Sequence, residues 1–317
     1  MKYILHFKKF SPAWSEKWKE YILFLKKNHN WEEIDISNFY EQTNVSLLSI
    51  IPDNATSILF FSYNSGLKAL HTIFDDINKI KIPKNIFFDD VHTLKKYKWD
   101  LSYYDKIITS VDSETFLSRF PNLKDKHIHI PHGTPSKSVI KINENPIKKI
   151  TITGCINRTI YNGRYVAKRL KNRGINNNIS SLKHPGYFLD NQKKPKSTKV
   201  SSDYYKFLNN HIGSLTSSGV IDGKIILVNK VFEICATGSL LLMDKKSEKK
   251  LNKLGFSDME NMILYDETSM DDINDKINFI INDKNKELID KIRKKGQDLT
   301  LEKHLTIHRA NLIDSII

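Results

Sequence analysis

Short apolar runs alternate with amphipathic segments along the whole chain of 317 residues. The apolar runs, such as Ser57–Ser62 and Lys149–Thr153, have the length of buried strands. The segments between them repeat apolar residues every three to four positions, as helices do. This alternation is typical of βαβ units and predicts parallel sheets with helices packed against them.

The first part of the chain predicts one doubly wound sheet. Its strands are expected at Tyr3–Phe7, Trp31–Ile36, Ser57–Ser62, Asn85–Phe88, Lys106–Thr109 and His127–Ile130. Helices are expected at Pro12–Lys27, at Ser65–Ile80, directly after His92, and at Asp112–Arg119. The segment 131–146 carries three prolines and a glycine, interrupts the pattern, and indicates a connection between domains.

A second series of strands follows this connection. Strands are expected at Lys149–Thr153, Asn178–Ser180, Ile212–Leu215, Ser239–Met243 and Met262–Tyr265, with helices between and after them. The pattern predicts two Rossmann-like domains in tandem, over residues 1–147 and 148–302, followed by a closing helix over 303–317.

The positive charge of the chain is concentrated in one stretch. The formal net charge is +14, from 50 Lys and Arg against 36 Asp and Glu, and residues 148–206 alone hold 14 basic and two acidic residues. The total therefore does not predict a uniformly basic surface. It leaves open a local site for an anion.

Two further features concern the compartment. No apolar run approaches the roughly 18 residues of a membrane-spanning helix, so no transmembrane segment is expected. Cys155 and Cys235 lie in apolar or small-residue runs without a partner at metal-ligand spacing. We therefore expect a cytoplasmic protein, both cysteines in its core and no metal site.

The stretch KVFEICATGSLLLMD, from Lys230 to Asp244, carries the most chemical information. A helix that ends at Gly238 and is followed at once by a strand begins at the carboxyl edge of the sheet, where open α/β sheets bind ligands. Lys230 and Glu233 share a face of this helix. The carboxylate suits a ribose diol and the ammonium suits a phosphate, whereas an ordinary surface ion pair has the same spacing.

This stretch resembles the K-x-x-E-x-x-A-x-G-x-x-x-x-x-D block of GT-B glycosyltransferases, in particular group 1 enzymes of the CgeB-like type. The tail GQDLTLEKHLTIHRANLI is similar to the closing G…H-x-T-x-x-R pattern of that group, whose last helix packs back on the first domain. The segments ITITGCINRTIYNGRYVAKRLKNRG and IFFDDVHTL are also similar to segments of the group. The resemblance implies a GT-B fold that binds a nucleotide-sugar, held mostly by the second domain.

The resemblance also implies roles for individual residues. Glu233 would contact the ribose, and Lys230 and the glycine turn at Gly154 would lie near the diphosphate. Arg158 and Arg164 are further candidates to neutralise the leaving diphosphate. Gly238 belongs to the same block. No cofactor or metal is implied beyond a nucleotide-sugar donor such as a UDP-sugar.

One position departs from the larger family. Many retaining GT-B enzymes carry a second glutamate eight positions before the ribose glutamate, and this chain has Ile225 there. The donor sugar and the stereochemical outcome therefore stay open.

The turn SLKHPGYF supplies three more candidates. The resemblance places a comparable turn beside the donor, so that His184 would touch the nucleotide or Tyr187 would stack on its base, with Lys183 as a further candidate of the same turn. A plain Pro-Gly turn with a tucked tyrosine explains the same residues equally well.

Asp90 and His92 are the candidates for a catalytic base. They follow a predicted strand of the first domain directly and so lie at its carboxyl edge, where either side chain could deprotonate an acceptor hydroxyl. Helix capping is the alternative for each of them.

We expect a glycosyltransferase that moves a sugar from a nucleoside diphosphate donor to a hydroxyl of a glycan-type acceptor, as in polysaccharide biosynthesis. The basic stretch at 148–206 keeps two alternatives open: a nucleic-acid-binding protein, or a glycosyltransferase that acts on DNA or another anionic acceptor. No aromatic ladder accompanies the charge, which weighs against the first of these.

Overall fold

The computed structural model describes residues 1–7, 12–39, 42, 45–62, 74, 76–88, 100–182 and 201–317, with only the backbone described at 12–15 and 62. Asp90 and His92, the helix expected after His92, and the turn with Lys183, His184 and Tyr187 lie outside these residues, as does most of the helix expected at Ser65–Ile80. The chain forms two compact units. The first comprises Met1–Phe10, Lys17–His132 and Ile307–Ile317, and the second comprises Ser11–Glu16 and Gly133–Thr306.

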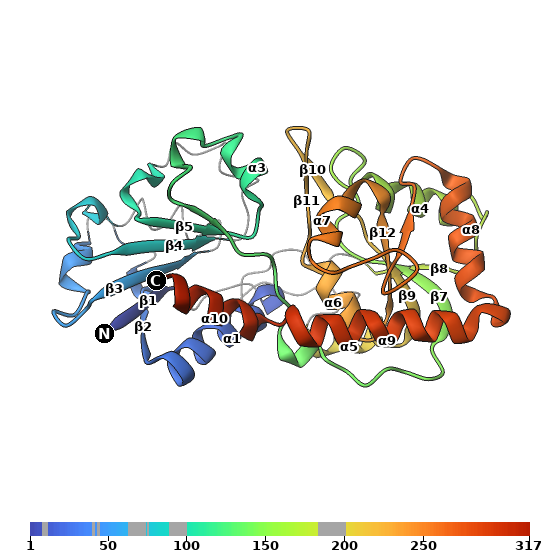
Figure 1. The fold of residues 1–317 in the computed structure, drawn as a ribbon, viewed down its shortest axis with the longest axis horizontal. Helices are drawn as coiled ribbons and strands as arrows, with labels where there is room; N and C mark the ends of the chain where they lie inside the picture. Colours follow the sequence, from blue (N-terminus) through green and yellow to red (C-terminus); the bar gives the residue numbers. More distant parts are fainter. Residues whose placement is uncertain are drawn as a thin grey trace. The chain divides into compact units, whose positions relative to one another are not determined.

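The first unit is built on a parallel sheet with the strand order β2-β1-β3-β4-β5-β6 (Figure 1). Its strands are β1 (Lys2–His6), β2 (Trp31–Asp35), β3 (Ser57–Ser62), β4 (Lys84–Phe88), β5 (Lys106–Thr109) and β6 (His127–His129). Helix α1 (Pro12–His29) packs on the sheet through Trp18 and Tyr21, which meet Phe61 at ring-centroid distances of 4.6 and 5.4 Å. Such aromatic burial is the largest apolar contribution that single side chains make to a core.

The second unit is built on a parallel sheet with the order β13-β12-β9-β7-β8. Its strands are β7 (Ile147–Ile152), β8 (Ile179–Ser181), β9 (His211–Leu215), β12 (Leu240–Asp244) and β13 (Ile263–Tyr265). Numbered along the chain, the first sheet has the order 2-1-3-4-5-6 and the second has the order 2-1-3-4-5. The strand order reverses between β1 and β3 in the first sheet and between β7 and β9 in the second. The predicted pair of Rossmann-like units in tandem is confirmed.

Helices cover both faces of the second sheet because its strands are apolar on both sides. Helices α4 (Asn162–Asn172), α8 (Met270–Ile281) and α9 (Lys286–Lys303) pack on the face that carries Leu240 and Leu242. Helices α5 (Ser201–Asn209), α6 (Lys230–Ala236) and α7 (Glu248–Asn252) belong to the core cluster that contains Leu241 and Met243.

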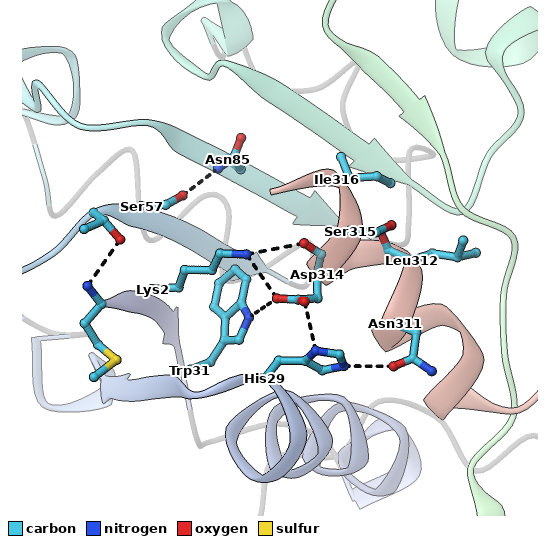
Figure 2. A network of polar contacts seen from close by, with 12 residues as sticks. Lys2, His29, Trp31, Ser57, Asn85, Asn311, Leu312, Asp314, Ser315 and Ile316 are labelled. Atoms are coloured by element: carbon cyan, nitrogen blue, oxygen red, sulfur yellow. Dashed lines mark hydrogen bonds and ion pairs between the residues drawn. The ribbon is translucent and has the colours of Figure 1, made fainter.

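The closing helix α10 (Thr306–Ile316) belongs to the first unit from Ile307 onward. The carboxylate of Asp314 accepts hydrogen bonds from Lys2 Nζ at 3.1 Å and Trp31 Nε1 at 2.7 Å, and lies 2.8 Å from His29 Nδ1 (Figure 2). The other ring nitrogen of His29 meets Asn311 Oδ1 at 2.8 Å. The predicted return of the last helix to the first domain is therefore confirmed.

Two connecting segments run side by side within the second unit. The backbone N–H of Thr134 donates to the carbonyl of His304 at 3.0 Å, and the N–H of Thr306 donates to the carbonyl of Thr134 at 2.9 Å. These residues adjoin the two points at which the chain passes between the units, after His132 and before Ile307.

A small hairpin and one cysteine differ from the sequence prediction. Strands β10 (Gly219–Ile221) and β11 (Lys224–Ile226) form a hairpin whose turn residues, Asp222 and Gly223, have φ of 49° and 75°. The prediction missed it because strands this short carry little periodicity. Cys155 is exposed, so its predicted place in the core is wrong, whereas Cys235 is buried as expected.

Short elements complete the described part of the chain. They are helix α3 (Ser113–Leu117) and the 3-10 turns η1 (Ser37–Phe39), η2 (Leu47–Ser49), η3 (Ile77–Lys79), η5 (Leu101–Tyr103), η6 (Pro121–Leu123), η7 (Ser136–Ser138), η8 (Lys245–Ser247) and η9 (Asp283–Asn285).

Candidate functional site

The carboxyl ends of β7 and β9 lie on either side of the point where the strand order of the second sheet reverses. Open α/β sheets bind ligands at such a point. Gly154 follows β7 by two positions, and the polar run Thr216–Ser218 follows β9 directly. The predicted glycine turn therefore lies where the topology favours a ligand.

Arg164 connects these two strand ends. It lies in the first turns of α4 and is 2% exposed. Its Nε and Nη2 donate to Thr216 Oγ1 at 3.2 and 2.9 Å, Nη2 also donates to the carbonyl of Ser217, and Nη1 donates to the carbonyl of Cys155 at 3.1 Å. The guanidinium also lies over the ring of Tyr161, 4.2 Å from its centroid.

Within the described part of the chain, the buried charge of Arg164 meets no opposite charge. All of its described hydrogen-bond acceptors are hydroxyl or carbonyl oxygens, and none of the described carboxylates forms an ion pair with it. Burial lowers the pKa of Arg164, but the group remains a cation at neutral pH. A buried cation without a counter-charge is costly, so this arrangement favours an anionic ligand.

Gly154 allows two cationic side chains to approach its backbone. Its φ is +96°, which side chains with a Cβ rarely adopt, and an added Cβ would lie 2.7 Å from Arg164 Nη1 and 2.9 Å from Lys230 Cε. Glycine is therefore required for both conformation and space. The structure brings together three predicted residues, Gly154, Arg164 and Lys230.

Lys230 and Glu233 lie at the start of α6, with side chains 19% and 15% exposed. Their charged atoms are 3.5 Å apart, and Lys230 Nζ donates a closer hydrogen bond of 3.0 Å to the hydroxyl of Tyr204. Burial opposes the charge on Lys230, but Tyr204 and Glu233 outweigh it and raise its pKa. Asn229 Nδ2 donates to the other Glu233 oxygen at 2.7 Å.

Buried polar contacts fix the loop after β9. The carboxylate of Asp244 accepts from the backbone N–H and the hydroxyl of Ser218, and burial raises the pKa of this carboxyl. The hydroxyl of Tyr265 donates to the carbonyl of Thr216 at 2.6 Å. Because Thr216 is held by β13 and also accepts from Arg164, the guanidinium has little freedom to move.

Other predicted residues lie apart from this group. Arg158 is exposed in the loop between Gly154 and α4. Gly238 follows the opposite end of α6, where its φ of +72° and the nearby Ile142 give it a structural reason to be glycine. Ile225 lies in β11, and its carbonyl accepts from Lys250 Nζ.

Sequence reasoning missed Thr216 and Tyr204 as members of the group. The polar run directly after a buried strand was a usable signal for Thr216. No signal pointed to Tyr204, because α5 precedes Lys230 by a whole strand and a hairpin, and only the fold brings them together.

Across the described ranges, no three His, Cys, Asp or Glu side chains group closely enough to hold a metal ion. No helix in the described part of the chain combines the length and apolarity required to cross a membrane.

Comparison with known proteins identifies related folds. Residues 164–315 match the family described as "Glycosyl transferase-like". No curated protein sequence matches the chain.

Three solved structures are similar over nearly the whole chain. They are sucrose-phosphate synthase from Thermosynechococcus elongatus (10% identity, TM-score 0.61, 100% and 98% of the two chains covered), Anabaena HepE in complex with UDP and glucose (10%, 0.62, 100% and 99%), and an alpha-glucosyltransferase in complex with UDP and a 13-mer DNA (12%, 0.64, 100% and 99%).

Proposed function

We propose that this protein transfers a sugar from a nucleoside diphosphate donor to an acceptor hydroxyl. Its residues 164–315 match the glycosyl transferase-like family, and its fold is GT-B. The observation that carries this proposal is the buried guanidinium of Arg164, which lacks a carboxylate partner in the described part of the chain and lies beside the glycine turn and Lys230. This group of residues is suited to a diphosphate.

The donor diphosphate would lie against Gly154, between the two cations. The positive φ of this glycine and its missing Cβ let phosphate oxygens approach the backbone closely. Arg164 and Lys230 would stabilise the negative charge that develops when the bond between the anomeric carbon and the diphosphate oxygen breaks. Two fixed cations can compensate this negative charge without a metal ion, so we include metal independence in the proposal.

Glu233 would bind the ribose of the donor. Its carboxylate is held by Asn229 on one oxygen and by Lys230 on the other, which fixes the direction of the remaining lone pairs. A carboxylate accepts from both hydroxyls of a diol at once. The acceptor hydroxyl would lose its proton as it attacks the anomeric carbon, and Asp90 and His92 remain the candidates to receive this proton.

UDP is the first nucleotide to test, because two of the similar folds were solved with it. Thermal denaturation of the purified protein with UDP, GDP and dTDP should show a rise of melting temperature with at least one of them. Glu233→Ala should reduce that rise. The absence of any shift with the whole panel would contradict the proposal.

We propose a glycan-type hydroxyl as the acceptor, with an anionic acceptor as the second candidate. The second candidate is supported by Lys168 and Lys171, whose ammonium groups both donate to the hydroxyl of Ser181, at 3.1 and 3.3 Å. Burial and the neighbouring charges of Lys168 and Lys149 lower the pKa of Lys171, as expected where like charges lie close together.

Acceptor selectivity separates these candidates. Transfer from a UDP-sugar would be measured to neutral oligosaccharides, to acidic oligosaccharides and to DNA with hydroxymethylated bases, in the wild type and in Lys168→Gln/Lys171→Gln. A neutral acceptor used equally well by both proteins supports the first candidate. Transfer to an acidic acceptor that is lost in the double variant and at high salt supports the second.

A further inference from the structure

From the contacts of Tyr204, and resting on the proposed function, we infer that this residue positions the ammonium group of Lys230 toward the donor phosphates. Tyr204 lies on α5 and is 8% exposed. Its hydroxyl is 3.0 Å from Lys230 Nζ, and the same ammonium lies 4.6 Å from the centroid of the Tyr204 ring. The tyrosine therefore holds the cation through both its oxygen and its ring face.

Lys230 has two partners that pull its ammonium to different places. The Tyr204 hydroxyl is the closer one, and the Glu233 carboxylate is 3.5 Å away. A lysine side chain is flexible, so without the hydroxyl the ammonium would move into full contact with the carboxylate. That movement would draw the charge away from Gly154, which Lys230 Cε now adjoins, while Asn229 would keep the Glu233 carboxylate in place for the ribose.

A neutral acceptor suits this role better than a second carboxylate. Burial raises the pKa of Tyr204, so the phenol keeps its proton at neutral pH. Its oxygen then accepts from Lys230 without neutralising the charge, while its O–H points toward Thr153 Oγ1 at 3.4 Å. Thr153 is the residue before Gly154, so the tyrosine links the cation to the start of the glycine turn.

The test compares two phenylalanine variants by isothermal titration with UDP and with uridine, which has no phosphate. Tyr204→Phe keeps the ring and loses the hydroxyl, and should weaken UDP binding about tenfold, the effect of losing one hydrogen bond to a charged group, with uridine binding unchanged. Tyr205→Phe is the matched control, since Tyr205 is the next residue on the same helix and is also buried. It should bind UDP as the wild type does.

A double-mutant cycle shows whether Tyr204 acts through the lysine. In a Lys230→Met background, Tyr204→Phe should have no further effect on UDP binding. A loss of UDP and uridine affinity together, or an undiminished effect in the Lys230→Met background, would assign Tyr204 to general packing and overturn the inference. A wild type that binds no nucleoside diphosphate would instead contradict the proposed function itself.

Discussion

Arg164 donates two hydrogen bonds to the hydroxyl of Thr216, from Nε at 3.2 Å and from Nη2 at 2.9 Å. Arg164 lies near the start of the helix that follows β7, and Thr216 directly follows β9, so the pair joins the ends of the two strands between which the order of the sheet reverses. The threonine orients the cation but leaves its charge uncompensated. Under the proposed function, the donor diphosphate would supply the opposite charge.

Arg164→Met should reduce the affinity for UDP by about 100-fold, since it removes a buried charged donor of about 1.5–3 kcal/mol per hydrogen bond to phosphate. The measurement is a UDP titration. Arg173→Met is the matched control, because Arg173 lies at the exposed end of the same helix. Equal affinities in the two variants would contradict the assigned role of Arg164.

Gly154→Ala should both destabilise the protein and displace Arg164 and Lys230. The strained φ alone costs about 1–2 kcal/mol, and the contacts at 2.7 and 2.9 Å require the two side chains to shift. Gly174→Ala separates the two effects, since Gly174 also has a positive φ, +68°, but nothing within 4 Å of the added Cβ. The melting temperature should fall in both variants, whereas the affinity for UDP should fall only in Gly154→Ala.

Asp314→Asn should reduce the free energy of unfolding of the first unit by about 1–3 kcal/mol, as it weakens the contacts with Lys2, Trp31 and His29. Partial burial opposes the charge of Asp314, but the hydrogen bonds from Trp31 and Lys2 outweigh it and lower its pKa from 3.8. The stabilisation is therefore full above about pH 4 and is lost as the pH falls through the lowered pKa.

Denaturant unfolding of the Asp314→Asn variant as a function of pH tests this expectation. The difference from the wild type should shrink below pH 4, whereas Asp298→Asn, in an exposed pair with Lys294, should differ little from the wild type at any pH. A constant difference down to pH 2 would show that the charge of Asp314 contributes nothing.

His127 should make the first unit sensitive to mild acid. Burial lowers its pKa to about 4, and its ring nitrogens meet Thr109 Oγ1 and Ser113 Oγ while the ring stacks on Phe116. His127 binds a proton near pH 6.5 in the unfolded chain but only near pH 4 in the folded chain. The free energy of unfolding therefore decreases as the pH is lowered from 6.5 to 4, by at most about 1.4 kcal/mol per pH unit. His127→Gln should flatten this slope in denaturant unfolding, and an unchanged slope would assign the sensitivity to other groups.

The alternation of strands and helices was predictable because buried parallel strands are short continuous apolar runs. Ser57–Ser62 and Lys106–Thr109 match the structure to the residue. The hairpin of β10 and β11 was not predictable in this way, since strands of three residues are too short to show a period.

In the site, too, contacts between residues close in the sequence were predictable, whereas contacts between distant residues were not. The block that begins at Lys230 placed a lysine and a glutamate on one helix, and the structure shows them 3.5 Å apart. The sequence could not separate Arg158 from Arg164, because both follow the same glycine turn. Only the start of α4 and the position of Thr216 decide that one is buried and the other exposed.

The return of the chain to its first unit has a consequence for how the protein is made. Residues 133–306 form one uninterrupted stretch of the second unit, with their ends joined through Thr134 and Thr306, so they are a natural fragment to express alone. The first unit lacks this property. During synthesis, Asp314 can contact Lys2 and Trp31 only after the entire second unit has been translated. The unit whose synthesis begins first is therefore the last to be completed.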